Sequence, residues 1–407
     1  MNEEDTLKFQ QPSNAPRIIK VIGVGGGGGN AVQNMYHEKI HNVSFVICNT
    51  DSQALEGSPI PIKVQLGEGL GAGNDPEVAR KAAEESRENI AKLFNDGTKM
   101  VFITAGMGGG TGTGAAPVVA EIAKELGILT VGIVTIPFRF EMSNKIHQAL
   151  KGVVEIAKHV DALLVINNQR LLEIYPELDI KTGFKKVDEV LTTATKSIAE
   201  IITIHGIINL DFKDVEKVLK DGGVAIMSNG TDKGEQRLAG AFDKALHSPL
   251  LNNNNIYDSK KILFNIYHNP EFSLKMGEME WVTNFMKRFK DGDIEVIWGM
   301  SEDNTLKEGE VKVTVLATGF GMHNIPEMRP LLDEEEREKE VEKQNLQNMM
   351  NNFYKEEFKV YIFEDADLDN EELISYIDSS PTHKRMSRDM QNMKNISQAQ
   401  AQEAESI

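Results

Sequence analysis

The chain has 407 residues, 40% of them hydrophobic, and a formal net charge of −18 at pH 7. This length is sufficient for two folded domains, and the hydrophobic share is typical of a soluble globular protein. The negative balance argues against a general nucleic-acid binder, because phosphate backbones bind basic surfaces, so we expect no nucleic-acid partner.

The single cysteine and the hydropathy pattern indicate the setting. Cys48 has no second cysteine for an intrachain disulfide, which is typical of a reducing compartment. It ends an apolar segment and is expected to be a small buried residue rather than a nucleophile. No run approaches the roughly 18 apolar residues of a membrane helix, and the acidic start from Met1 to Asp5 lacks the apolar stretch of a signal peptide. We therefore expect a cytoplasmic protein without direct membrane insertion.

Residues 1–16 are polar, contain Pro12 and Pro16, and are expected to form a disordered arm. Residues 17–183 alternate short apolar segments with amphipathic ones, which predicts an α/β domain whose mostly parallel sheet is covered on both faces. The predicted strands are 18–24, 43–48, 100–104, 129–135 and 162–166. The predicted helices are 30–37, 76–94, 115–126, 144–158 and 169–174.

A glycine-rich loop, Gly23-Val24-Gly25-Gly26-Gly27-Gly28-Gly29-Asn30, follows the first predicted strand. Gly23, Gly25 and Gly28 match the dinucleotide fingerprint G-x-G-x-x-G. Asp51 follows the second strand at about the distance that this fingerprint expects. A nicotinamide-dependent oxidoreductase is therefore one interpretation, although a run of five glycines satisfies many patterns.

A second glycine-rich loop is the strongest signal in the chain. Six of the nine residues from Gly106 to Gly114 are glycine, and they lie between a predicted buried strand and a predicted helix. Glycine lets the backbone approach a ligand closely and aim N–H groups at it, and the helix N-terminus favours anions. Thr111 and Thr113 add hydroxyl donors. The loop predicts a di- or triphosphate site; a flexible surface loop is the alternative, but such a loop need not join a buried strand to a helix.

The presence of two such loops separates these interpretations. A Rossmann domain needs one glycine-rich turn, whereas two loops on adjacent strands can hold one polyphosphate from two sides. Neither loop ends in Gly-Lys-Ser/Thr, which excludes a P-loop.

Residues 184–209 are predicted to form a long connecting helix and the start of a loop. Val187, Leu191, Ala194 and Ile198 repeat there at helical spacing. A smaller α+β domain is predicted for 210–325. Its helices are expected near 212–219, 233–247 and 276–288, and its strands near 223–227, 260–267, 293–298 and 310–317.

The composition changes beyond the second domain, where residues 326–407 are expected to be a flexible acidic linker and a disordered tail. Asp333 to Glu340 is a charge run, and an Asn/Gln/Met-rich stretch follows it. Such a segment lacks the apolar residues of a core, so we expect at most transient helix near 333–350. A solvated spacer is favoured over a specific acidic interaction site.

Several motifs along the chain resemble those of the tubulin/FtsZ GTPase superfamily. Gly108 to Gly114 is similar to the signature loop, and Gly23 to Asn30 to the N-terminal loop of the bacterial branch. Further matches are Asn49-Thr50-Asp51, Gly69-Leu70-Gly71-Ala72-Gly73, Pro137-Phe138-Arg139-Phe140-Glu141, Asn168, Phe184 with Asp188, and Asn209-Leu210-Asp211-Phe212-Lys213-Asp214. The resemblance covers roughly residues 17–325. It implies a Rossmann-like, nucleotide-binding GTPase domain, a central helix and a smaller C-terminal domain.

The resemblance implies that the ligands are GTP and GDP. The residues implied at the phosphates are Gly26, Gly27, Gly28, Gly29, Asn30, Gly108, Gly109, Gly110, Thr111, Gly112 and Thr113, with Gly73 near the terminal phosphate. Glu141 and Asn168 are implied at the sugar or base. Phe184 would stack on the base, with ordinary core packing as the alternative, and Asp188 would accept from guanine N1–H and N2–H₂. Lys145 stands where the superfamily often has arginine, so it would support a phosphate without a forked contact.

The segment from Asn209 to Asp214 allows two interpretations. Asp211 is suited to cap the following helix, and Asp214 to lie in its first turn. The resemblance implies instead that this loop enters the nucleotide pocket of the next subunit, where Asn209, Asp211 and Asp214 are catalytic and the carboxylates orient the attacking water. Mg²⁺ is then expected to bridge the phosphates with mostly water ligands.

Head-to-tail contacts of this kind do not close, so the resemblance implies filaments that form the bacterial division ring at mid-cell, with hydrolysis activated by polymerisation. A filament-forming relative that has lost hydrolysis is a further alternative, against which the two carboxylates argue. Membrane-tethering and regulatory partners are expected. The nearest candidate for docking them is residues 371–388, an apolar patch followed by basic residues inside the tail.

Overall fold

The computed structural model of the protein describes residues 17–40, 42–204, 206–247, 256–287 and 294–333, followed by 337, 344–345, 360–363, 367–382, 385 and 387–405. The chain divides into two compact units, Met1–Leu332 and Asp333–Ile407. None of the helices in the described part of the chain is long and apolar enough to cross a membrane.

A single sheet runs through the described part of the first unit, with eleven strands in the order β3-β2-β1-β4-β5-β6-β8-β11-β9-β10-β7. The first six strands in the chain are β1 (Ile19–Val24), β2 (Val43–Asn49), β3 (Ile62–Gln65), β4 (Met100–Gly106), β5 (Leu129–Ile136) and β6 (Ala162–Asn167). The others are β7 (Gly206–Ile208), β8 (Gly223–Lys233), β9 (Lys261–His268), β10 (Glu295–Glu302) and β11 (Glu310–Phe320). The α/β fold class is therefore confirmed.

The N-terminal half of the sheet is parallel throughout, as the alternating pattern predicts. Every residue of β1 and of β5 is buried, which is typical of parallel strands covered on both faces. The carboxyl ends of these strands meet at one edge. There, Val24 of β1 lies beside Ala105 of β4, and this register brings the two glycine-rich loops together.

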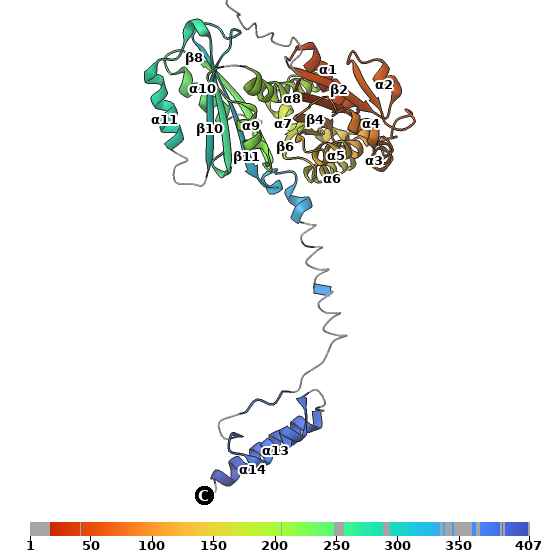
Figure 1. Ribbon diagram of the computed structural model, residues 1–407, viewed down its shortest axis with the longest axis vertical. Helices are drawn as coiled ribbons and strands as arrows, with labels where there is room; N and C mark the ends of the chain where they lie inside the picture. Colours follow the sequence, from red (N-terminus) through yellow and green to blue (C-terminus); the bar gives the residue numbers. More distant parts are fainter. Residues whose placement is uncertain are drawn as a thin grey trace, which may run out of the picture. The chain divides into compact units, whose positions relative to one another are not determined.

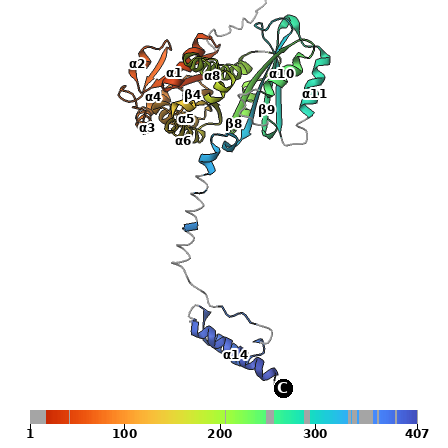
Figure 2. The ribbon, with the colours of Figure 1, turned by 180° about the vertical axis from the view of Figure 1, so that it is seen from behind.

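Helices cover both faces of the sheet (Figures 1 and 2). One hydrophobic core lies under α3 (Pro76–Glu85), α4 (Arg87–Lys92), α5 (Gly110–Glu125), α6 (Ser143–Ala157), α10 (Arg237–Leu246) and α11 (Met279–Lys287). A second core lies under α1 (Gly25–His37), α2 (Ser52–Glu56), α7 (Asn168–Ile174), α8 (Ile180–Thr203) and α9 (Phe212–Leu219). Short 3₁₀ turns occur at Arg139–Glu141, Ile256–Asp258, Pro270–Phe272, Met276–Glu278 and Met322–Asn324.

The C-terminal half of the sheet is mixed. Strand β11 is antiparallel to both β8 and β9, β10 is parallel to β9, and β7 closes the far edge. The two halves join where Ala162 to Leu164 of β6 pair in parallel with Gly223 to Ala225 of β8. The domain limits at 183, 209 and 325 stay a prediction.

Helix α8 is the long helix that the apolar periodicity predicts. Its 24 residues lie between the N-terminal and C-terminal halves (Figure 1). Val187, Leu191, Ala194 and Ile198 are all buried, so the predicted apolar face is the face that packs. The helix begins four residues before Phe184, because Asp179 caps it by accepting from the N–H of Thr182 at 3.0 Å.

Several boundaries differ from those predicted. Helices α1 and α5 begin inside the glycine runs, at Gly25 and Gly110, and the predicted helix 76–94 is broken at Ser86 into α3 and α4. Strands β3 and β7 are not predicted at all, because segments of four and three residues are too short to carry a period-two pattern. Cys48 is buried, as expected.

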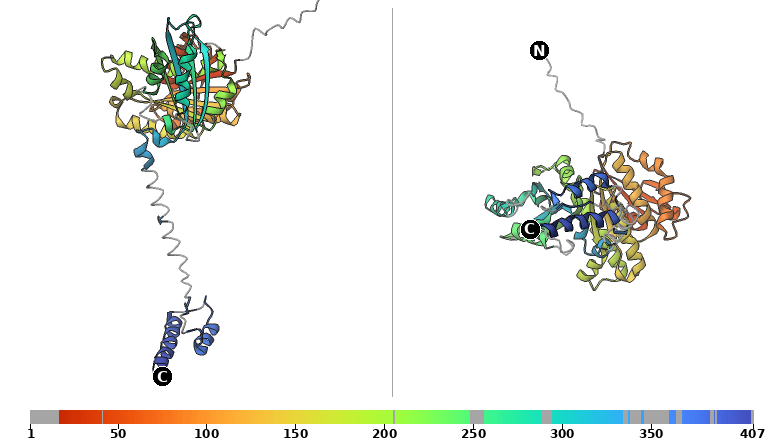
Figure 3. Two further views of the ribbon diagram at one scale, coloured as in Figure 1. Left: turned by 90° about the vertical axis from the view of Figure 1, so that its left-hand side faces the viewer. Right: turned by 90° about the horizontal axis from the view of Figure 1, so that it is seen from below.

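The second unit contains two described helices, α13 (Glu371–Ser379) and α14 (Ser387–Glu405), which lie side by side (Figure 3). Leu373 and Met393 are fully buried, and Asn392 donates to the hydroxyl of Tyr376 at 3.0 Å. This part of the chain therefore has a small core, which the expectation of a tail without one did not include. The charge run from Asp333 to Glu340 lies mostly outside the described residues.

Candidate functional site

The two glycine-rich loops end adjacent strands and begin helices α1 and α5. The N-cap residues, Val24 and Gly109, make no side-chain cap bond. A helix leaves its first N–H groups without intrahelical partners. Two helix starts without side-chain caps therefore point backbone donors at one edge of the sheet, and this arrangement favours a bound anion.

Close backbone approach explains why glycine is needed in these loops. A Cβ on Gly112 would lie 2.4 Å from the carbonyl oxygen of Gly106, and one on Gly28 would lie 2.2 Å from that of Thr104. Gly25 has a φ of +73°, in the left-handed region where side chains are disfavoured. Larger residues would push the loops apart or strain them.

A cavity of about 340 Å³ opens beside these loops. It is lined by predicted site residues from five parts of the chain: Gly26, Gly27, Asn30, Gly109, Gly110, Thr111, Gly112, Glu141, Lys145, Asn168, Phe184 and Asp188. Residues that the sequence analysis did not assign also line it: Gly106, Met107, Thr135, Pro137, Val187 and Leu191. Thr135 and Pro137 lie at the carboxyl end of β5, and that position in a parallel sheet is the signal by which they could have been found.

Two polar side chains and one aromatic ring line the end of the cavity that α7 and α8 form. Asn168 is buried, and its Oδ1 accepts no hydrogen bond within the described structure. Asp188 is half-buried, and burial, with a smaller contribution from Glu189, raises the pKa of its carboxyl to about 6. Phe184 meets Phe138 edge to face at 5.2 Å and is 40% exposed. These groups suit a planar ligand that donates hydrogen bonds along one edge.

Glu141 and Lys145 pair with each other in this structure. The Lys145 ammonium lies 2.6 Å from Glu141 Oε2, and Glu141 Oε1 accepts from the N–H of Phe138 at 2.9 Å. A ligand phosphate near Lys145 would therefore compete with the Glu141 carboxylate for the positive charge of the lysine. The hydroxyls of Thr50 and Thr111 are 2.7 Å apart, which links the loop after β2 to α5.

Five predicted phosphate-loop residues do not line the cavity: Gly28, Gly29, Gly73, Gly108 and Thr113. The Thr113 hydroxyl accepts from the N–H of Gly108 at 2.8 Å, so this bond joins the start of the glycine-rich loop to the first turn of α5. Gly73 has a φ of +55° and belongs to a loop, residues 71–74, that packs against Gly110.

The acidic loop from Asn209 to Asp214 also lies outside the cavity of its own chain. Asp211 caps α9 by accepting from the N–H groups of Lys213 and Asp214, at 2.7 and 3.1 Å. Asp214 accepts from the N–H of Asp211 at 3.0 Å, and Asn209 accepts from that of Gly206 at 2.6 Å. The capping interpretation is confirmed, and Asn209 and Asp211 are exposed.

The dinucleotide interpretation receives no support from the geometry. Asp51, its expected ribose ligand, caps α2 by accepting from Gln53 and Ala54 and does not line the cavity. Burial raises the pKa of the Cys48 thiol to about 12, so this residue is no nucleophile.

Comparisons with known proteins agree with this geometry. Residues 18–176 match the Tubulin/FtsZ family GTPase domain, 223–321 the FtsZ family C-terminal domain, and 355–403 a further FtsZ C-terminal family. The chain is 47% identical to the cell division protein FtsZ of Porphyromonas gingivalis over 97% of its own length and 91% of that protein. It is 45% identical to FtsZ of Coxiella burnetii over 77% and 81% of the two chains.

Solved structures agree as well. An FtsZ dimer from M. jannaschii superposes with a TM-score of 0.67 at 38% identity, covering 75% of this chain and 89% of that one. The resemblance extends beyond the expected 17–325, because the tail matches too. The chain therefore belongs to the FtsZ family of cell division proteins and is a GTPase with a tubulin-like GTPase domain.

Proposed function

We propose that GTP hydrolysis by this protein is completed between two copies, as they assemble head to tail into the filaments of a division ring. The cavity of one copy holds the nucleotide. Asn209, Asp211 and Asp214 of the next copy enter it and orient the attacking water. The activity thereby depends on assembly.

The observation that carries this proposal is the placement of both sites along α8. Phe184 and Asp188 lie near its start, whereas the acidic loop follows its end at Thr203. At a rise of about 1.5 Å per residue, Thr203 lies roughly 28 Å along the axis from Phe184. Carboxylates that far from the cavity act on its ligand only if another copy supplies them.

Exposed apolar side chains accompany both sites. Near the cavity, Phe140 is 54% exposed and Ile180 is 71% exposed; beside the acidic loop, Ile207 is 63% exposed. Apolar groups on two different surfaces support a heterologous contact, which repeats without closing and so builds a filament.

Within the cavity, Phe184 would stack on guanine while Asp188 accepts from N1–H and N2–H₂, and Asn168 Oδ1 would gain the hydrogen-bond partner it lacks. The N–H groups at the starts of α1 and α5 would bind the phosphates, with Gly73 beside the terminal one. No cluster of three or more histidine, cysteine or acidic side chains is found among the described residues, which is compatible with a Mg²⁺ ion held by phosphates and water. Bound there, Mg²⁺ would neutralise charge that develops on the phosphates.

A mixing experiment tests whether the site is shared. Asp188→Ala removes the base acceptor, and Asp214→Asn removes a catalytic carboxylate while keeping an oxygen for the cap. Each variant alone is expected to release little phosphate from GTP. An equal mixture should recover up to about a quarter of the wild-type rate, because random head-to-tail contacts join an intact cavity to an intact loop that often.

The control replaces a carboxylate of α9 that has no assigned role. In a mixture of Glu216→Gln with Asp188→Ala, the rate of phosphate release should match the number of Glu216→Gln subunits present, because only these have an intact cavity. A mixture of the two inactive variants that stays at the sum of their separate rates would refute a shared site. A wild-type rate per molecule that does not depend on protein concentration would refute it too.

We further propose that the second unit docks membrane-tethering or regulatory partners at mid-cell. Within the candidate segment 371–388, Leu373 of α13 is buried, whereas Ile374 is 38% exposed. Deleting residues 367–405 removes α13 together with the helix it packs on. The deletion should leave GTP turnover unchanged and abolish recruitment to the membrane; unchanged recruitment would contradict this role.

A further inference from the structure

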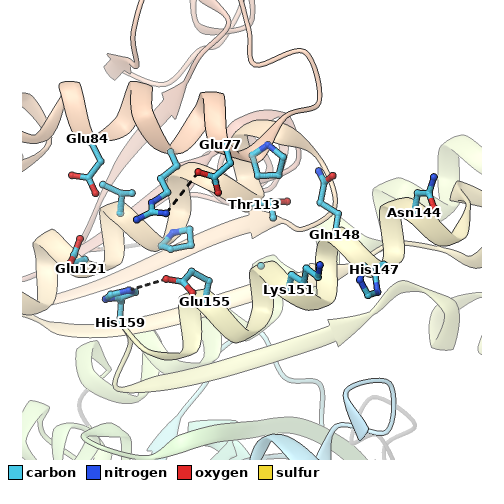
Figure 4. Close-up of a pocket in the computed structure, with 16 residues that line it drawn as sticks. Glu77, Glu84, Thr113, Glu121, Asn144, His147, Gln148, Lys151, Glu155 and His159 are labelled. Atoms are coloured by element: carbon cyan, nitrogen blue, oxygen red, sulfur yellow. Dashed lines mark ion pairs between the residues drawn. The ribbon is translucent and has the colours of Figure 1, made fainter. Parts of the chain in front are cut away.

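One side chain of α6 joins two loops that are distant in sequence. The amide nitrogen of Gln148 donates to the carbonyl oxygen of Asn74 at 3.3 Å and to that of Gly108 at 3.2 Å. A carboxamide NH₂ group carries two hydrogens, so it can make both bonds at once. Figure 4 shows Gln148 and its neighbour His147 pointing in different directions from the helix.

The two loops are also in direct contact. A Cβ on Gly110 would lie 2.9 Å from the nitrogen of Asp75 and 3.0 Å from the Cβ of Ala72. The loop of residues 71–74 therefore rests on the start of α5, where the cavity is lined by backbone. A displacement of either loop would alter the space beside Gly110.

The 71–74 loop has a backbone that needs external support. Gly71, Gly73 and Asn74 all have positive φ values, and for Asn74, at +62°, this costs energy because it carries a side chain. The N–H of Gly71 donates to Thr50 and that of Asp75 to Ala72. The bond from Gln148 holds the carbonyl of the strained residue itself.

The bond to Gly108 fixes the direction of a cavity donor. In a trans peptide the C=O and the following N–H point in opposite directions. Since Gln148 holds the carbonyl of Gly108 on the α6 side, the N–H of Gly109 is turned the other way, and Gly109 lines the cavity.

We propose that Gln148 is a positioning residue for GTP: it fixes the 71–74 loop and the Gly108–Gly109 peptide in the arrangement that encloses the terminal phosphate. The inference rests on the proposed function in one respect, that the terminal phosphate lies between these two loops. Gln148 does not itself line the cavity, and it acts through the two loops whose backbone carbonyls it holds. Its loss therefore affects a triphosphate more than a diphosphate.

The test is the ratio of two affinities in one variant. Gln148→Met keeps the length of the side chain and removes both donors. We expect affinity for a non-hydrolysable GTP analogue to fall about tenfold, as for two hydrogen bonds to neutral acceptors. Affinity for GDP should change less than about twofold by the same reasoning. Both are measured by titration calorimetry on the full chain below its assembly concentration.

The matched control is His147→Met, the same new side chain one position earlier on α6. His147 is exposed and makes no hydrogen bond to either loop among the described residues, so this change should leave both affinities unchanged. Gln148→Glu is a second variant of native size, in which a carboxylate faces two carbonyl oxygens; it should weaken analogue binding more than Gln148→Met does, again sparing GDP. Equal losses for both nucleotides in these variants would mean a merely structural role and would overturn the proposal, as would wild-type affinities.

The proposed function fails in a different way. If the wild-type chain itself binds the analogue no better than it binds the corresponding ATP analogue, the cavity is not a guanine site, whatever Gln148 does. If the wild type selects the guanine analogue and Gln148→Met behaves like the wild type, the inference about Gln148 alone is wrong.

Discussion

The two ends of α8 differ in how their polar groups are satisfied. Near its start, Asn168 Oδ1 is buried without a partner in the described structure, and Asp188 holds its charge in a partly desolvated place. Past its end, Asn209, Asp211 and Asp214 each accept from a backbone N–H. The first arrangement stores a cost that a ligand would relieve, whereas the second is a complete helix cap. A binding site can therefore be recognised from polar groups that lack hydrogen-bond partners. A loop that acts on another molecule can have all of its hydrogen bonds satisfied within its own chain.

The largest effect is expected from a substitution in the acidic loop past the end of α8 that leaves the helix cap intact. Asp214→Asn retains an oxygen that can accept from the N–H of Asp211 but lacks the charge that we propose orients water. GTP turnover at saturating substrate should fall by about 100-fold or more, the usual contribution of a positioned base. GTP binding and filament formation should persist, as measured by calorimetry and light scattering. Full turnover in this variant would leave Asp214 with capping alone.

A smaller effect is expected at the cavity end from Asp188→Asn. The amide then presents a donor to guanine N1–H and N2–H₂, so GTP affinity should fall about 10- to 100-fold, corresponding to the loss of a charged hydrogen bond. Xanthosine triphosphate, which has a carbonyl at C2, should bind the variant better than GTP does. A variant that binds both as weakly as each other would indicate that Asp188 supports the fold of the site and does not read the base.

The smallest effect is a dependence on pH. Burial raises the pKa of Asp188 to about 6, so its carboxyl in the nucleotide-free protein is mostly ionised at pH 7.5 and mostly protonated at pH 5.5. Because guanine donors need the ionised form, GTP affinity should decrease about fourfold between those values, as follows from the titration of one carboxyl. Asp188→Asn is the control and should show no such loss. A flat profile in the wild type would show that the carboxyl titrates below this range.

The sequence predicts those elements that are marked by a long apolar pattern or a dense run of glycines. It does not predict those whose position depends on tertiary contacts. The buried strands and α8 follow from apolar periodicity, and the two loops from glycines that strand register brings together at Val24 and Ala105. The early start of α5 at Gly110 could not be predicted, because glycine is a poor helix former and the close packing of Gly110 against the 71–74 loop exists only in the folded chain.

The site shows the same division. The spacing of Asp211 and Asp214 predicts a helix cap, and the structure shows that cap, so the catalytic role proposed for them rests on the family resemblance alone. The unpartnered oxygen of Asn168 and the bridge from Gln148 to the carbonyls of Asn74 and Gly108 depend on segments distant in sequence that meet only in the folded chain. No local pattern contains that information.

The burial of Cys48 has a practical consequence. It is the only cysteine in the sequence, and with a thiol pKa near 12 almost none of it is thiolate at neutral pH, so maleimide dyes should leave it unmodified. The wild-type chain is thus already a background for single-site labelling. A cysteine introduced at an exposed position such as Glu308 would carry the only dye, and energy transfer between labelled copies would then report exchange of subunits between filaments.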